Sequence, residues 1–230
     1  VAQLVDLNHD GEADFYACYS NAFETSPGGH DFICGLERDD AGAFYTASSN
    51  QGLVRIAPGG QAAEVLATGV RNPDGLGILP DGSLTLPSSE GNWVPASMIG
   101  LVAPAGRSHA ANRRPHFGYG GPIDNLPPDL PLVYLPRAID NSSGGQTVVP
   151  QQVWGPLAGQ LLHFSFGRGS WFTVLRDVVD GQAQGAVVPM AGEFRSGAHR
   201  GRFSPQDRHL YVTGQQGWGT YTIDDGCLHR

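Results

Sequence analysis

The sequence contains no lysine, only three cysteines and no long apolar run. Its longest uninterrupted apolar stretches are a few residues, too short for a helix that crosses a bilayer. All positive side chains are therefore arginine or histidine, and 22 acidic residues against 14 basic ones give a formal net charge of −8. This charge argues against nucleic acid and anionic membrane surfaces as partners.

The cysteines Cys18, Cys34 and Cys227 match neither a disulfide framework nor a zinc site. A Cys18–Cys34 bridge with Cys227 left over is one interpretation, and buried free thiols are another. No Cys-x-x-Cys-His is present, so this chain carries no c-type haem attachment. No signal peptide is visible, and we expect a mature protein or a fragment.

Turn-forming residues are abundant, with 33 glycines and 17 prolines, while 40% of the residues are apolar. That composition indicates a turn-rich globular protein rather than a disordered one. No apolar stripe with helical spacing is present. Residues 69–86 show the prevailing pattern, because Leu76 and Ile78 precede the turn Pro80-Asp81-Gly82, and Leu84 and Leu86 follow it.

Short strands of this kind recur along the chain. We expect them at 1–5, 15–19, 32–37, 42–48, 52–57, 62–67, 75–79, 82–87, 98–103, 132–135, 160–166, 171–177, 186–190, 201–204, 209–213 and 217–223. Four strands in roughly 40–50 residues, repeated, predict an all-β β-propeller. Residues 1–230 would then form one domain of the six-bladed type with about five blades present. A β-sandwich is the alternative.

The sequence also predicts one strand pairing and two loops. Val1–Val5 is expected to complete the blade that ends at Cys227–Arg230. Residues 104–131 form a long excursion rich in proline, glycine, arginine and histidine, and loops of this length are often functional. Residues 140–145 are predicted to be a flexible polar loop.

The segment Asp6–Asp14 places oxygen-bearing side chains at alternating positions around Gly11, and these are Asp6, Asn8, Asp10 and Asp14. Hard cations such as Ca²⁺ prefer ligands of this kind. The closing glutamate of an EF-hand is absent, which favours a Ca²⁺-stabilised β-turn. An Asx-rich hairpin turn without metal is an equal alternative.

The loops at one end of a propeller converge, so loop residues next to strands are candidates for a shared site. His30 is a candidate base, or else a hydrogen-bonded loop histidine. Arg71 and Asn72 suit a carboxylate or quinone oxygen. Arg200 and Arg202 share one strand face, which calls for an anionic partner from a ligand or from the protein.

Further candidates are weaker, and of these His163, Asp140, Asn141 and Trp93 would contact the substrate. His163 and Arg168 lie at or near strand ends, while Asp140 and Asn141 belong to the polar loop. Trp93 is a candidate sugar-stacking platform, with packing as the alternative role. Together these residues indicate a small anionic ligand or a sugar.

These motifs resemble the six-bladed propeller superfamily of soluble PQQ-dependent glucose dehydrogenase and aldose sugar dehydrogenases. The closer likeness is to propeller domains of Planctomycete-type bacteria, which are often fused to cytochrome c. It runs nearly end to end, and it is carried by Asp6–Asp14, His30, Gly69–Gly77, Asp140-Asn141-Ser142, Trp154-Gly155-Pro156, Arg200–Phe203 and Gly217-Trp218.

The resemblance implies a secreted or periplasmic quinoprotein that oxidises a sugar, with a cytochrome c as a possible electron acceptor. His30 would deprotonate the sugar hydroxyl, while hydride passes to PQQ. The cofactor would be held by Arg71, Asn72, Arg168, Arg200 and Arg202, with its Ca²⁺ bound at Gly91 and Asn92.

The sequence also departs from the family pattern. The lysine that binds PQQ has no counterpart, and Arg168 stands near its place. An N-terminal portion of the propeller is expected to be absent. Two alternative functions remain open. One is a cofactor-free lyase or hydrolase that acts on uronates with His30 or His163 as base, and the other is a non-catalytic carbohydrate-binding module.

Overall fold

The computed structural model describes residues 1–26, 28, 31–33, 35–104, 113–192, 194–215 and 225–230. Within these ranges the one helical element is a 3₁₀ turn, η1, at Gly155–Leu157, so the all-β prediction is confirmed. The strands are β1 (Ala2–Val5), β2 (Phe15–Cys18), β3 (Glu37–Arg38), β4 (Phe44–Ser48), β5 (Gly52–Ile56), β6 (Ala63–Ala67), β7 (Gly77–Ile78), β8 (Leu84–Ser88), β9 (Ser97–Val102), β10 (Val133–Leu135), β11 (Ser143–Val148), β12 (Leu161–Ser165), β13 (Ser170–Val179), β14 (Gln182–Pro189), β15 (Arg200–Phe203), β16 (Leu210–Gly214) and β17 (Cys227–His229).

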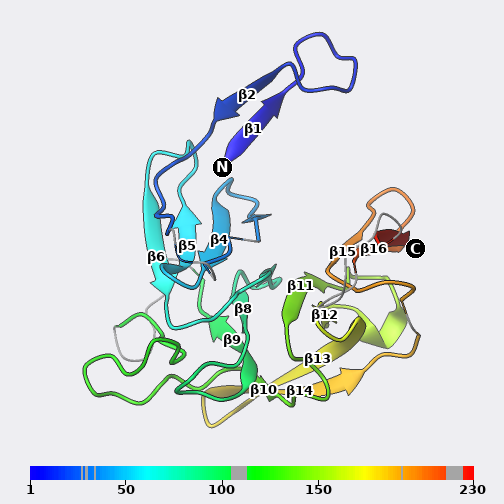
Figure 1. Cartoon of the computed structure of the whole chain (residues 1–230). Helices are drawn as coiled ribbons and strands as arrows, with labels where there is room; N and C mark the ends of the chain where they lie inside the picture. Colours follow the sequence, from blue (N-terminus) through cyan, green and yellow to red (C-terminus); the bar gives the residue numbers. More distant parts are fainter. Residues whose placement is uncertain (27, 29–30, 34, 105–112, 193, 216–224) are drawn as a thin grey trace.

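Strands that are consecutive in sequence pair antiparallel and build sheets that follow one another around an arc (Figure 1). In the described part of the chain, three sheets have four strands, in the orders β3-β4-β5-β6, β7-β8-β9-β10 and β11-β12-β13-β14. A further sheet has the order β15-β16-β17. We call β3, β7, β11 and β15 the inner strands. Of these, β11 contacts both β7 and β15.

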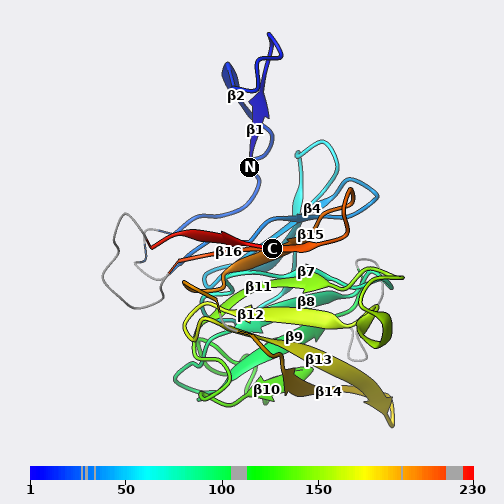
Figure 2. The same cartoon turned by 90° about the vertical axis from the view of Figure 1, so that its right-hand side faces the viewer.

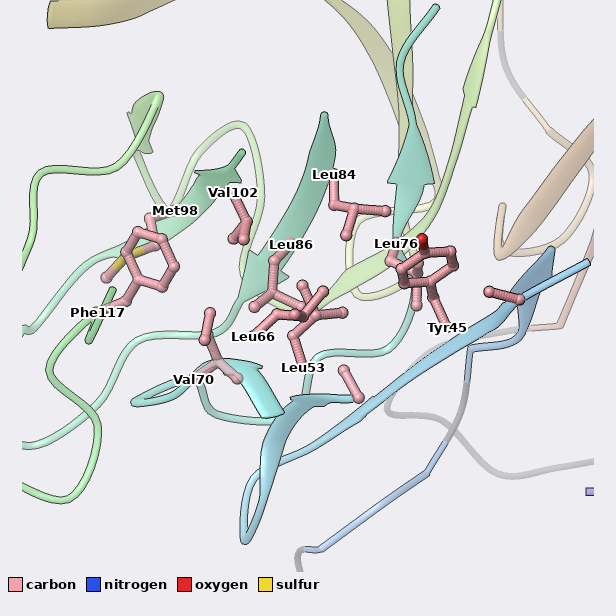
Figure 3. Packing of buried hydrophobic residues seen from close by; sticks show 13 residues of the cluster. Tyr45, Leu53, Leu66, Val70, Leu76, Leu84, Leu86, Met98, Val102 and Phe117 are labelled. Atoms are coloured by element: carbon pink, nitrogen blue, oxygen red, sulfur yellow. The ribbon is translucent and has the colours of Figure 1, made fainter. Parts of the chain in front are cut away.

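The hydrophobic core lies between neighbouring sheets. Leu53 and Leu66 from one sheet pack in a cluster with Leu84 and Leu86 from the next (Figure 3). Similar clusters fill the space between the second and third sheets and between the third and fourth. Because alternate side chains of a strand point to opposite faces, Thr85 faces the other neighbouring sheet, where it contacts Gln146. Both faces of the sheets are thus used.

The antiparallel order decides which loops lie together. Loops between the second and third strands of a sheet, and loops that link one sheet to the next, fall at the same end because successive strands reverse direction. We call this the loop end, and it carries residues 49–51, 68–76, 89–96, 136–142, 166–169 and 194–199. Of the predicted site residues, Arg71, Asn72, Gly91, Asn92, Trp93, Asp140, Asn141 and Arg168 belong to these loops, and Arg200 and Arg202 lie on the strand that follows residues 194–199.

Three sequence predictions need correction. Val1–Val5 does not pair with Cys227–His229, because β1 pairs with β2 in a hairpin that projects away from the sheets (Figure 2). Residues 140–145 are not entirely loop, since the inner strand β11 begins at Ser143. The predicted strand at 32–37 is reduced to Glu37–Arg38.

Other expectations keep their standing as predictions. The predicted strand at 217–223 lies outside the described residues, and the described sheets do not establish the number of blades.

The cysteines differ from both interpretations of the sequence. Cys18 and Cys227 are free thiols, and Cys18 is exposed rather than buried. Cys34 lies outside the described residues. In the ranges described, no helix is long and apolar enough to cross a membrane.

Candidate functional site

Glycines allow the inner strands to approach each other closely at the loop end. A Cβ atom on Gly75 would lie 2.6 Å from the carbonyl oxygen of Gly144, and one on Gly145 would lie 2.9 Å from the carbonyl oxygen of His199. The backbone N–H of Gly145 donates to that same His199 oxygen at 2.6 Å. Side chains next to these glycines, far apart in sequence, are thereby brought together.

The charged side chains gathered there form one cluster, which we call the inner charge cluster: Glu37, Asp74, His199, Arg200 and Arg202. His199 Nε2 lies 2.5 Å from Asp74 Oδ2, and Arg200 Nη2 lies 3.4 Å from Asp74 Oδ1. Arg202 forms an ion pair with Glu37. The cluster therefore links β15 in the last sheet to β3 in the first and to the loop before β7.

Arg200 and Arg202 were predicted to need an anionic partner, and the carboxylates of Asp74 and Glu37 are these partners. Burial raises the pKa of the Glu37 carboxyl, while the nearby guanidinium of Arg202, and more weakly that of Arg200, act in the opposite direction. The ring of His199 also packs against that of Phe166, with ring centres 4.8 Å apart and the ring planes tilted by 36°.

The predicted substrate residues Asp140 and His163 lie in a different place, because both side chains are fully buried. His163 Nδ1 accepts from the amide of Gln146 at 3.1 Å, which leaves Nε2–H to donate to Asp140 at 3.1 Å. Such side chains have no direct access to a ligand from solvent. They form a buried polar network, completed by hydroxyl groups of Thr85, Ser143 and Ser165.

This network determines the ionisation of Asp140. Burial alone would raise the pKa of its carboxyl, but the hydrogen bond from His163 and the hydroxyls of Ser165 and Ser143 together hold it below its ordinary value. The neighbouring residue Asn141 is exposed at the surface.

Arg71 and Asn72 lie at the loop end as predicted. Arg71 Nη1 donates to the carbonyl oxygen of Glu90 at 3.1 Å. The backbone N–H of Asn72 donates to Ser49 Oγ at 2.9 Å. Asn72 has a φ of 44°, which is uncommon for a non-glycine residue, and its Oδ1 is buried without a hydrogen-bond partner among the described residues.

A pocket of about 700 Å³ opens beside this pair, and it is lined by small and polar residues with one tyrosine: Ser26, Gly28, Asp31, Ser49, Asn50, Thr68, Gly69, His116, Tyr119, Gly120, Gly121, Pro122 and Ile123. Asp31 Oδ1 accepts from the backbone N–H of Asn50 at 2.9 Å. Asp31 Oδ2 is buried and has no hydrogen-bond partner in the described part of the chain. A buried carboxylate oxygen of this kind needs a donor from a ligand or water.

The other wall of the pocket comes from the long excursion predicted at 104–131. His116 Nε2 donates to the carbonyl oxygen of Gly121 at 2.8 Å, so Nδ1 accepts from the Thr68 hydroxyl at 3.0 Å. The backbone N–H of Tyr119 donates to the carbonyl oxygen of Gly69. Residues 116–121 of the excursion are thus fixed against the loop that carries Arg71.

The remaining predicted residues are dispersed. His30 lies outside the described residues, although Gly28 and Asp31 on either side of it line the pocket. Trp93 is exposed in the loop at 89–96. Arg168 lies in a separate pocket of about 450 Å³ beside Arg195.

Most of the predicted metal ligands form hydrogen bonds within the protein. Gly91 donates its N–H to the carbonyl oxygen of Val94, and Asn92 is exposed. In the projecting hairpin, side-chain oxygens accept backbone N–H groups in the manner of an Asx-rich turn, and this holds for Asp6, Asn8, Asp10 and Asp14. Over the described ranges, no group of three or more His, Cys, Asp or Glu side chains is arranged to hold a metal.

Sequence reasoning missed Asp31, Glu37, Asp74 and His199 as site residues. Asp74 stands inside the segment Gly69–Gly77, and His199 directly precedes Arg200–Phe203, and both segments carry the family resemblance. Their pairing over 125 positions leaves no signal in a single sequence. Asp31 directly follows the candidate base His30, which was the available clue.

No protein-family model matches the sequence, and no curated protein matches it. Solved structures of several dehydrogenases share the fold, and three of them serve as examples. A glucose dehydrogenase has a TM-score of 0.68 and 18% identity over 99% of this chain and 71% of its own. The apo form of a soluble aldose sugar dehydrogenase from Escherichia coli has a TM-score of 0.58 and 15% identity, over 88% of this chain and 66% of its own.

The third is the PQQ-bound form of an aldose sugar dehydrogenase from Streptomyces coelicolor, with a TM-score of 0.54 and 13% identity. The match covers 86% of this chain and 61% of that protein. This chain therefore spans between 61% and 71% of the length of the three structures. At this level of identity the likeness concerns the fold, and the chain is an all-β protein with the propeller fold of these dehydrogenases.

Proposed function

We propose that this chain is a sugar dehydrogenase-like oxidoreductase that binds a sugar in the loop-end pocket. The observation that carries the proposal is the buried Oδ2 of Asp31, which lacks a hydrogen-bond partner among the described residues and belongs to a pocket of about 700 Å³. The fold shared with glucose and aldose sugar dehydrogenases supports the choice of substrate class.

The lining of the pocket suits a polyhydroxylated ligand. A carboxylate accepts hydrogen bonds from sugar hydroxyls, and the Asn50 amide and the Ser49 hydroxyl can both donate and accept. The volume lies within the range of small-molecule sites. In the proposed reaction the sugar hydroxyl loses its proton to His30 and its carbon loses hydride to a two-electron acceptor.

The residues of this chain do not fit PQQ as that acceptor. PQQ carries several carboxylates, which need free cationic partners. Of the arginines predicted to hold the cofactor, Arg200 and Arg202 have Asp74 and Glu37 as partners. The chain also has no lysine. PQQ is therefore not the acceptor in the proposed reaction.

Calcium is a separate question. The oxygens of Asp6, Asp10 and Asp14 are of the right chemical type, but they accept backbone N–H groups instead of converging on one point. A Ca²⁺ site in this hairpin stays a prediction, as does one at Gly91 and Asn92.

The wider setting is also proposed rather than observed. A location in the periplasm or outside the cell, and a cytochrome c partner, rest on the resemblance described above. The same holds for a missing N-terminal part of the propeller.

Aldose-dependent reduction of an artificial dye tests the proposed function. Purified chain should oxidise at least one of a panel of aldoses with added acceptors that include PQQ with Ca²⁺ and uncharged quinones. Asp31→Asn should lower kcat/KM by more than about tenfold, since it weakens hydrogen bonds to a charged acceptor. Asp40→Asn, at an exposed position, is the matched control. Sugar binding without oxidation by any acceptor would contradict the proposal and favour a carbohydrate-binding module.

A further inference from the structure

The inner charge cluster combines equal numbers of arginine and acidic side chains. Arg200 pairs with Asp74 through Nη2, and its Nη1 donates to the carbonyl oxygen of His199 at 3.1 Å. Arg202 pairs with Glu37 through Nη2, and its Nη1 donates to backbone carbonyl oxygens. Both terminal nitrogens of each guanidinium therefore already have protein acceptors.

The acidic partners come from distant parts of the chain. Glu37 lies 165 positions from Arg202, and Asp74 lies 126 positions from Arg200. They reach the arginines because the inner strands meet at the loop end, where Gly75 and Gly145 permit close packing. The pairing is thus a product of the fold rather than of neighbouring residues on one strand.

Half-burial gives these pairs weight. The side chains of Asp74 and Arg200 are 16% and 27% exposed, and that of Glu37 is 22% exposed, whereas that of Arg202 is 50% exposed, so burial strengthens the Asp74–Arg200 pair most. Charges that are partly buried interact more strongly than charges fully exposed to water and salt. An incoming carboxylate would have to displace a protein carboxylate and would then be repelled by it.

We propose that Glu37 and Asp74 are specificity-determining residues, which act as built-in counter-ions for Arg200 and Arg202. They make the inner end of the site accept uncharged ligands and reject polyanions such as PQQ. This inference goes beyond the proposed sugar oxidation and does not depend on it, because it concerns which charges the site tolerates.

The test is calorimetric titration of the full chain with PQQ at low ionic strength. Wild-type protein should bind PQQ only weakly, whereas the variant with Glu37→Gln and Asp74→Asn should bind PQQ more than about tenfold more tightly than wild type. Adding Arg200→Ala and Arg202→Ala to that variant should abolish the gain. Asp207→Asn removes an exposed acid in the turn after β15 and should bind like wild type.

Cooperative thermal unfolding shows that each variant is folded, and Glu37→Gln alone replaces the double variant if the latter does not fold. Two results would overturn the inference. One is tight PQQ binding by wild type that is lost on substitution of Arg200 and Arg202. The other is a folded variant without the acids that binds PQQ no better than wild type. Neither result depends on whether the chain oxidises sugars.

Discussion

At the scale of single residues, Asp140 illustrates how a polar side chain becomes part of the core. Its two oxygens accept hydrogen bonds from His163, Ser143 and Ser165. The network continues through Gln146 to Thr85 in the preceding sheet. Since buried polar groups are costly unless they are hydrogen-bonded, this arrangement stabilises one packing of the two sheets.

Substituting Asp140→Asn should lower the free energy of unfolding by roughly 1–3 kcal/mol near neutral pH, because the amide cannot accept all of the present hydrogen bonds. The pKa of Asp140 is lowered in the folded protein, so its ionisation stabilises the fold above the ordinary value of 3.8. This contribution is lost as the pH falls through the lowered pKa. Denaturant unfolding of wild type and variant at several pH values measures the difference.

The stability advantage of wild type over Asp140→Asn should therefore be full near neutral pH and should shrink below pH 3.8. Asp40→Asn, which changes an exposed carboxyl, serves as the control and should cost little. A variant as stable as wild type at neutral pH would contradict the role given to the network.

At the scale of elements, the inner strands depend on glycine. The segment Ser143–Val148 forms strand β11 although it begins with Ser143-Gly144-Gly145, which by propensity favours a loop. The close approach of Gly75 and of the strand β15 requires small residues there. Tertiary packing therefore overrides local propensity, and this is why the sequence predicted a loop at 140–145.

Gly75→Ala should lower the free energy of unfolding by about 1–3 kcal/mol, since the added Cβ would lie 2.6 Å from backbone atoms of β11. Denaturant unfolding followed by tryptophan fluorescence measures the effect. Gly226→Ala is the matched control, because a Cβ there would meet no atom within 4 Å. Equal stability of the two variants would contradict close packing of the inner strands.

At the scale of the whole molecule, the repeating strands and turns predicted the antiparallel sheets, because each meander is specified by neighbouring residues. The turn Pro80-Asp81-Gly82 between β7 and β8 is an example. Contacts that join different sheets were not predictable in the same way. The pairing of Asp74 with His199 and of Glu37 with Arg202 depends on packing between sheets, and it changes the ligand that the arginines suit.

The sequence predicted the position of Arg71 and Asn72 but not the burial of His163. Arg71 and Asn72 were placed next to a strand by sequence, and the structure has them in the loop before β7. The burial of His163 could not be foreseen, since its position on β12 gives no sign of which neighbouring sheet covers it. A lone histidine in a strand therefore carries little information about function.

The central claim is that the loop-end pocket binds a sugar through Asp31, and titration of the folded chain with D-glucose and other aldoses tests it most directly. We predict saturable binding of at least one aldose, weakened by more than about tenfold in Asp31→Asn and unchanged in Asp40→Asn. Absence of saturable binding by a cooperatively folded chain, or binding that Asp31→Asn leaves unaltered, would contradict the claim.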